Sequence, residues 1–145
     1  MKPIVTWVLV ANTREVSVFE NRGVGKGLAE LPGMRSVSET PDLPRDRPGM
    51  GHSIAGYNVA AVEQPDPQDK IDEQFASDAV AKLTRALTNH RFDRLVVAAG
   101  PHMLGLLRQQ YNEPLSAVLI GEIDKDLTAQ SVKAVASHVE DFIAL

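Results

Sequence analysis

The feature that most constrains this chain is an apolar run, Leu95 to Ala99, followed at once by Gly100 and Pro101. An unbroken apolar run of this length is typical of a strand that is covered on both faces. Proline has a φ near the helical value and lacks an N–H that the first helical turn could not use, so Pro101 favours a helix start. The following apolar residues can give that helix a buried side: Met103, Leu104, Leu106 and Leu107. The pattern predicts a central strand that turns sharply into a helix, and ligands of open α/β sheets usually bind beyond the end of such a strand.

The bulk composition favours one globular domain. The chain has 145 residues, of which 43% are hydrophobic, enough for a single core. There is no cysteine, which excludes disulfides, thiolate metal ligands and thiol catalysis and is consistent with a reducing compartment. The net charge of −4 is the opposite of what a protein that grips long nucleic acids normally carries, so only a local basic patch could serve that purpose.

The first third of the chain predicts three strands. Residues Ile4 to Ala11 form an apolar run that is too short and too soon interrupted for a secretory signal. Residues Glu15 to Glu20 alternate and follow a polar turn, which indicates a hairpin partner, and a third strand is expected from Leu28 to Leu31. Because no stretch approaches the ~20 apolar residues that span a bilayer, we expect no membrane insertion and a cytoplasmic protein.

Residues Pro32 to Gln68 read as one long, flexible loop rich in proline and glycine. Loops of this length inside a compact domain tend to be functional or disordered. Arg45 and Arg47, followed by two glycines and His52, form a candidate anion-binding segment, since arginine recognises phosphate bidentately. The alternative is a solvated loop in which neighbouring aspartates cancel the two arginine charges.

The remaining chain predicts helices that alternate with strands. Residues Asp69 to His90 predict a helix with an apolar stripe at helical spacing: Ile71, Phe75, Ala79, Leu83 and Leu87, widened by Ala76, Val80 and Ala86. A break at Asn112 to Pro114 precedes a strand from Ala117 to Ile123. A last helix is expected after Thr128, a plausible N-cap, with an apolar stripe of Val132, Val135, Ala136, Val139, Phe142 and Ile143. The predicted fold is therefore a single α/β domain in the order strand, strand, strand, helix, strand, helix, strand, helix. It has a mixed five-stranded sheet with helices on its faces, antiparallel in the first three strands and parallel in the last two.

Candidate binding residues cluster near the predicted central strand. His102 lies in the first turn of its helix, where unpaired backbone N–H groups attract anions, together with Gly100. Arg108 follows almost two turns later, and Lys125 lies between two aspartates at the end of a strand. A locally bonded histidine and a solvated connection are the alternatives. The four histidines show no metal-ligand spacing and Ser53 lacks a nucleophile-elbow context, so we expect no metal and no cofactor.

Several segments resemble the bacterial host-attachment protein family: Trp7 to Asn12, the helix ending in Leu87, Phe92 to Pro101, Leu104 to Arg108 and Glu122 to Thr128. The resemblance spans nearly the whole chain. The family takes its name from bacteria that need it to attach to host cells. It is also thought to be related to the middle domain of archaeal and eukaryotic class-1 release factors and of Pelota, which implies a ribonuclease-H-like fold.

The resemblance implies a binding role without release-factor catalysis. Release factors carry a Gly-Gly-Gln tripeptide that promotes ester hydrolysis, whereas this chain has no Gly-Gly pair. Our leading hypothesis is a non-enzymatic protein that docks on the ribosome, on tRNA or on a protein partner through its long loop. One alternative is a hydrolase acting on a phosphate-bearing small molecule at the Gly100–Pro101–His102 turn. Another is an indirect role in attachment to host cells.

Overall fold

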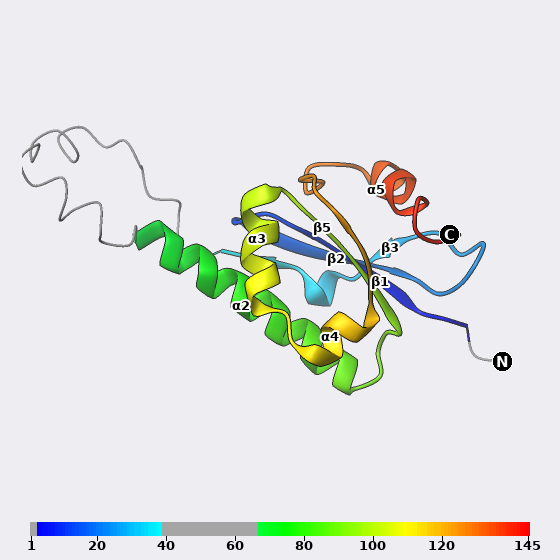
Figure 1. Cartoon of the computed structure of the whole chain (residues 1–145). Coiled ribbons are helices and arrows are strands. Elements are labelled where there is room, and N and C mark those ends of the chain that lie inside the picture. Colours follow the sequence, from blue (N-terminus) through cyan, green and yellow to red (C-terminus); the bar gives the residue numbers. More distant parts are fainter. Residues whose placement is uncertain (1–2, 39–66) are drawn as a thin grey trace, which may run out of the picture.

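The computed structural model describes residues 3–38 and 67–145, which fold into one sheet with helices on both faces (Figure 1). Local sequence explains the strands, since each of the longest ones is an apolar or alternating run. The described elements are β1 (Thr6–Ala11), β2 (Glu15–Asn21), β3 (Ala29–Glu30), the 3₁₀ turn η1 (Pro32–Met34), β4 (Ser36–Val37), α2 (Pro67–Thr88), β5 (Arg94–Ala99), α3 (Pro101–Gln110), α4 (Glu113–Val118), β6 (Leu119–Ile123) and α5 (Val132–Val139).

The sheet is mixed, as the sequence predicts. Its strand order is β3-β2-β1-β5-β6, and β4 pairs separately with β2. β1 pairs with β2 antiparallel and with β5 parallel, and β5 pairs with β6 parallel. Within the described part of the chain the sheet has six strands rather than the five expected. The additional strand, β4, has only two residues, too few to show a period in the sequence.

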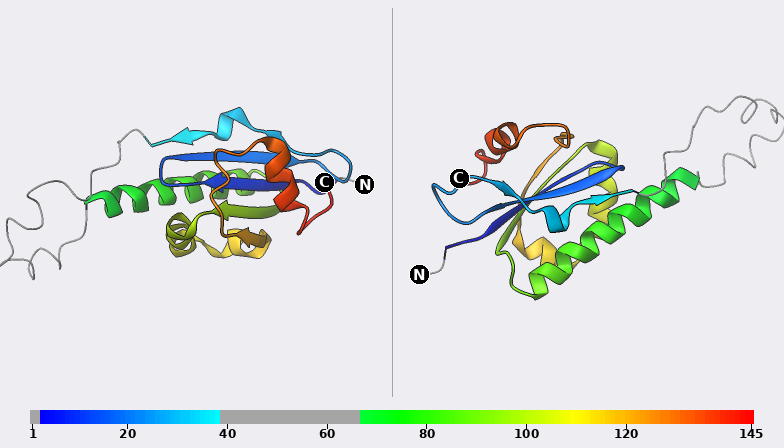
Figure 2. Two further views of the ribbon diagram at one scale, coloured as in Figure 1. Left: turned by 90° about the horizontal axis from the view of Figure 1, so that it is seen from above. Right: turned by 180° about the vertical axis from the view of Figure 1, so that it is seen from behind.

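The strands present two different faces because successive side chains point to opposite sides. In β5, Leu95, Val97 and Ala99 join a buried cluster with α2, α3 and α4. Val96 and Ala98 join a second cluster with α5. We call these the three-helix face and the single-helix face; Figures 1 and 2 show α5 on its own across the sheet from the other helices.

Helix α2 buries a stripe that differs from the expected one. Ala76, Ala79, Val80, Leu83 and Ala86 are buried as predicted. The predicted stripe members Ile71, Phe75 and Leu87 are only half-buried. Towards its N-terminus the buried stripe continues instead into two polar residues, Gln68 and Asp72.

Two predicted boundaries were wrong. Ala117 and Val118 do not open a strand, because Asn112 caps a further short helix, α4: its side chain accepts a hydrogen bond from the Leu115 N–H at 3.0 Å. Likewise Thr128 does not cap the last helix. The cap of α5 is Ser131, whose hydroxyl accepts from the Ala134 N–H at 3.1 Å.

The segment predicted as a long loop contains regular structure at both described ends. Pro32–Met34 form η1, Ser36–Val37 form β4, and residues 67 and 68 belong to α2. These short elements were missed because η1 has one turn and β4 two residues. The remainder, residues 39–66, lies outside the described residues together with its candidates Arg45, Arg47 and His52.

Candidate functional site

The parallel strands β1, β5 and β6 end at the same edge of the sheet, the usual ligand side of such folds. Hydrogen bonds within the protein bridge the ends of β1 and β6 at this edge. The amide of Asn12, directly after β1, donates to Asp126 Oδ2 at 3.2 Å and to Thr128 Oγ1 at 3.0 Å. Asp126 in turn accepts from the Thr128 N–H at 2.9 Å and from its hydroxyl at 2.6 Å. The connection after β6 is thereby tied to the turn after β1.

The Asp126 carboxylate is stabilised as an anion beside the turn that leads into α3. Partial burial acts to raise its pKa, but the hydrogen bonds from Thr128 and Asn12 outweigh burial, and the net effect lowers the pKa. A Cβ atom placed on Gly100, the N-cap of α3, would lie 3.8 Å from the Asp126 Cβ. An anion at this helix start would therefore meet a negative neighbour.

His102 points to a carboxylate as well. Its Nε2 atom lies 3.2 Å from Oδ2 of Asp72 on α2, while more than half of the imidazole side chain is exposed. Asp72 is buried, and its other oxygen accepts a hydrogen bond from the amide of Gln68 at 2.9 Å. The side chain of Asp69 also reaches this place: one ligand atom from each of Asp69, Asp72 and His102 lies within 4.8 Å of the others. We call these three residues the Asp–Asp–His cluster.

The two remaining described candidates are Arg108 and Lys125. Arg108, near the end of α3, forms an ion pair with Glu122 on β6, with Nη2 at 2.8 Å and Nε at 3.1 Å from Oε1. The Tyr111 hydroxyl donates to the second carboxylate oxygen at 3.0 Å. The hydrogen bond from Arg108 is the main reason that the pKa of Glu122 is lowered, and burial is the main reason that the pKa of Tyr111 is raised. Lys125 is exposed in the connection after β6.

Gly100 and His102 lie at the start of α3 and Arg108 near its end, while Lys125 adjoins Asp126 in the connection that approaches Gly100. Sequence reasoning missed two partners: Asp72 for His102, and Glu122, which also accepts a hydrogen bond from Tyr111, for Arg108. A signal for Asp72 existed, because extending the buried stripe of α2 by four residues from Ala76 reaches it. No local signal pointed to Glu122, since its partner lies 14 residues away on another element.

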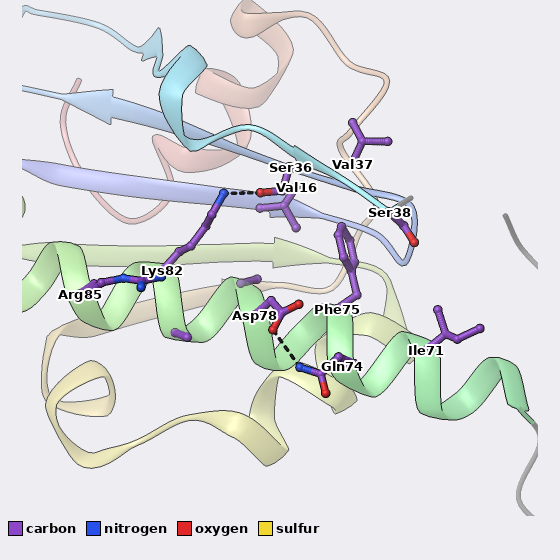
Figure 3. Close-up of a pocket in the computed structure, with 12 residues that line it drawn as sticks. Val16, Ser36, Val37, Ser38, Ile71, Gln74, Phe75, Asp78, Lys82 and Arg85 are labelled. Atoms are coloured by element: carbon purple, nitrogen blue, oxygen red, sulfur yellow. Dashed lines mark hydrogen bonds between the residues drawn. The ribbon is translucent and has the colours of Figure 1, made fainter. Parts of the chain in front are cut away.

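A groove of about 610 Å³ opens elsewhere, between α2 and the strands β2 and β4 (Figure 3). Val16, Phe75 and Ala79 supply apolar lining, and Ile71 lines the groove from the start of α2. Polar residues also line it. Lys82 donates to the Ser36 hydroxyl at 2.6 Å, and Asp78 accepts from the Gln74 amide at 2.8 Å. Arg85 completes the basic end of the groove. Among the described residues this lining contains no histidine.

Known structures share the fold. The crystal structure of an archaeal translation termination factor, aRF1, superposes with a TM-score of 0.50 at 8% identity, over 95% of this chain and 39% of that one. A second structure, titled only as an archaeal protein, gives a TM-score of 0.47 at 11% identity over the same shares. This chain therefore spans about two fifths of the length of the proteins it resembles.

In the described residues no helix has the length and apolarity to cross a membrane.

Comparison of the sequence with curated proteins yields no match, whereas a family model does match. A family model described as "Protein required for attachment to host cells" matches residues 7–139. Because that match covers nearly the whole chain, the protein belongs to the family of proteins required for attachment to host cells.

Proposed function

We propose that this protein is a non-enzymatic binding protein that associates with the translation machinery, through the ribosome or tRNA. The observation that carries the binding role is the bridged edge of the sheet. At the ends of β1 and β6, Asn12, Asp126 and Thr128 bond to one another, in the place where enzymes of this architecture hold their substrates. The likeness to an archaeal termination factor, which extends over 95% of this chain, supports the choice of partner.

The charges at this edge argue against the phosphate hydrolase. A phosphate at the start of α3 needs donors and positive charge. The neighbours of Gly100 and His102 are instead the acidic residues Asp126 and Asp72, and the guanidinium of Arg108 is already paired with Glu122. With these side chains alone, a phosphate-bearing substrate would meet negative charge where the alternative requires it to bind.

Contact with RNA requires a local basic patch, because the net charge of the chain is −4. We propose Arg45 and Arg47 as that patch, with His52 nearby in the sequence. Lys125, which is exposed in the connection after β6, is a secondary candidate that lies far from this segment in the sequence. In this proposal the attachment from which the family takes its description follows indirectly, from an effect on translation.

The test is sedimentation of the purified protein with ribosomes. Wild type should co-sediment at low salt, and added salt should release it as counterions compete for the phosphates. Reversing both arginines, Arg45→Glu with Arg47→Glu, should weaken co-sedimentation at least about 10-fold.

The matched control carries the same change of charge at exposed positions of the described fold: Arg22→Glu with Lys133→Glu. It should sediment like wild type. If both double variants lose binding equally, the effect is one of net charge and the arginine patch is wrong. If wild type fails to sediment at any salt concentration, the association with ribosomes is wrong; filter binding to tRNA then decides the other half of the proposal.

A further inference from the structure

We propose that the Asp–Asp–His cluster binds a divalent transition-metal ion, with Zn²⁺ or Mn²⁺ as the matching type. Asp69 and Asp72 come from the first two turns of α2, and His102 comes from the first turn of α3. Their ligand atoms, two carboxylate oxygens and one imidazole nitrogen, lie within 4.8 Å of one another. The site is independent of the proposed role in translation.

The separation of the two best-placed ligand atoms is close to that expected in metal coordination. Nε2 of His102 and Oδ2 of Asp72 are 3.2 Å apart. Tetrahedral zinc binds histidine nitrogen and carboxylate oxygen at ~2.0–2.2 Å, so neighbouring ligand atoms around one ion are about 3.3–3.6 Å apart, slightly more than the hydrogen-bonded separation seen here. Asp69 offers the third ligand atom, within 4.8 Å of the other two. A metal ion would compete with the contacts that the two carboxylates make at present.

Burial distinguishes this cluster from acidic residues that only favour a helix start. Exposed acids near a helix N-terminus stabilise it through the dipole. Asp72 instead is 1% exposed, in line with the apolar stripe of α2, and its carboxylate is turned to an imidazole on another helix. Buried charges in proteins are generally paired or bound to a metal.

Gln68 supplies the outer support that metal ligands usually have. Its amide, itself 2% exposed, donates to Asp72 Oδ1 at 2.9 Å, which leaves Oδ2 directed to His102. Such outer hydrogen bonds fix the orientation of a ligand and are typically worth 10- to 100-fold in metal affinity. His102 is more than half exposed, so an ion can reach the site from solvent and keep water in its open positions.

The donor set selects the class of metal. Imidazole suits zinc and other transition metals, carboxylate suits manganese as well as zinc, and calcium prefers six to eight oxygen ligands. We expect Zn²⁺ to bind more tightly than Mn²⁺, following the general order of affinity, and Ca²⁺ to bind least.

The experiment is calorimetric titration of the full chain with Zn²⁺, with Mn²⁺ used to locate the site by paramagnetic broadening of amide NMR signals. Wild type should bind one Zn²⁺, and Mn²⁺ should broaden the signals around residues 69–72 and 102. His102→Ala and Asp69→Asn should each weaken Zn²⁺ binding at least about 10-fold, and Gln68→Ala about 10-fold. Because Asp72 is buried, Asp72→Asn is interpreted only if its Tm stays near that of wild type.

The matched controls are His138→Ala on α5 and Asp78→Asn, which lies further along α2 and is exposed. Both should bind Zn²⁺ like wild type. The proposal is overturned if wild type binds no Zn²⁺, or if His102→Ala and Asp69→Asn bind it unchanged. Broadening by Mn²⁺ centred on another part of the chain would overturn it as well.

Discussion

The two faces of the sheet differ in how many apolar residues they bury. Among the described residues, 20 buried apolar residues make up the cluster of the three-helix face with α2, α3 and α4, whereas 10 make up that of the single-helix face with α5. On the second face Val132 and Phe142 stay about 40% exposed although the helical spacing predicts both for the buried stripe. The polar contacts at His102 and Arg108 also come from helices of the first face. The comparison teaches that the three-helix face carries most of the stability of the fold.

The largest effect is expected from a charge inside the three-helix face. Val97 on β5 is fully buried, and Val97→Asp places a carboxylate there without a partner, which should unfold the protein or nearly so. The control is Val132→Asp at the rim of the single-helix face, where the side chain reaches water. Thermal melting checks both; a Val97→Asp variant that melts within a few degrees of wild type would show that β5 is not central.

Substitutions that create a cavity should lower the free energy of unfolding by different amounts on the two faces. Leu107 on α3 and Val139 on α5 are both fully buried, one on each face. Leu107→Ala should cost about 2–5 kcal/mol of the free energy of unfolding, as other buried leucines do. Val139→Ala removes two methyl groups and should cost about 1.5 kcal/mol. Urea denaturation measures both, and equal losses would contradict the unequal faces.

Helix caps provide a smaller comparison. Asn112 caps α4 and also donates to the Thr84 hydroxyl of α2 at 2.8 Å, so it joins two helices of the three-helix face. Ser131 caps α5 through a single bond to the Ala134 N–H. Replacing either cap by alanine should lower the free energy of unfolding by about 0.5–2 kcal/mol, and Asn112→Ala should lie nearer the upper value. The reverse order, again in urea denaturation, would mean that the bond to Thr84 adds nothing.

The smallest effect concerns pH and the pair of Arg108 and Glu122. The pKa of Glu122 is lowered in the folded state, chiefly by the hydrogen bond from Arg108, from an ordinary value of 4.5. Its contribution to stability is therefore present above that ordinary value and lost as the pH falls through the lowered pKa of the folded state. Wild type should melt slightly above Glu122→Gln near pH 7, and this difference should shrink once the pH falls below 4.5 and through the lowered pKa of Glu122. A difference that persists in acid would mean that the carboxylate charge is not the cause.

The sequence by itself determined the parts of this protein that depend on local pattern. The apolar run Leu95 to Ala99, the break at Gly100 and Pro101, and the alternation from Glu15 to Glu20 gave β5, α3 and β2 in nearly their observed places. The long periodic segment gave α2 within two residues at each end. These predictions succeed because a strand or a helix that is buried against any partner shows the same spacing of apolar residues. The short elements β4 and α4 lack such a period and were missed, whereas β3, as short as β4, lies within the strand expected from Leu28 to Leu31.

Only the tertiary structure decided which polar groups meet. Position 102 could be placed at the carboxyl edge of the sheet from sequence, but its contact with Asp72, 30 residues earlier, depends on how α2 packs beside α3. The same holds for Arg108, whose partner Glu122 lies on the neighbouring strand. Distances between side chains on separate elements depend on the packing angle and register of those elements. No local pattern encodes these quantities, since they arise only when both elements settle on the same core.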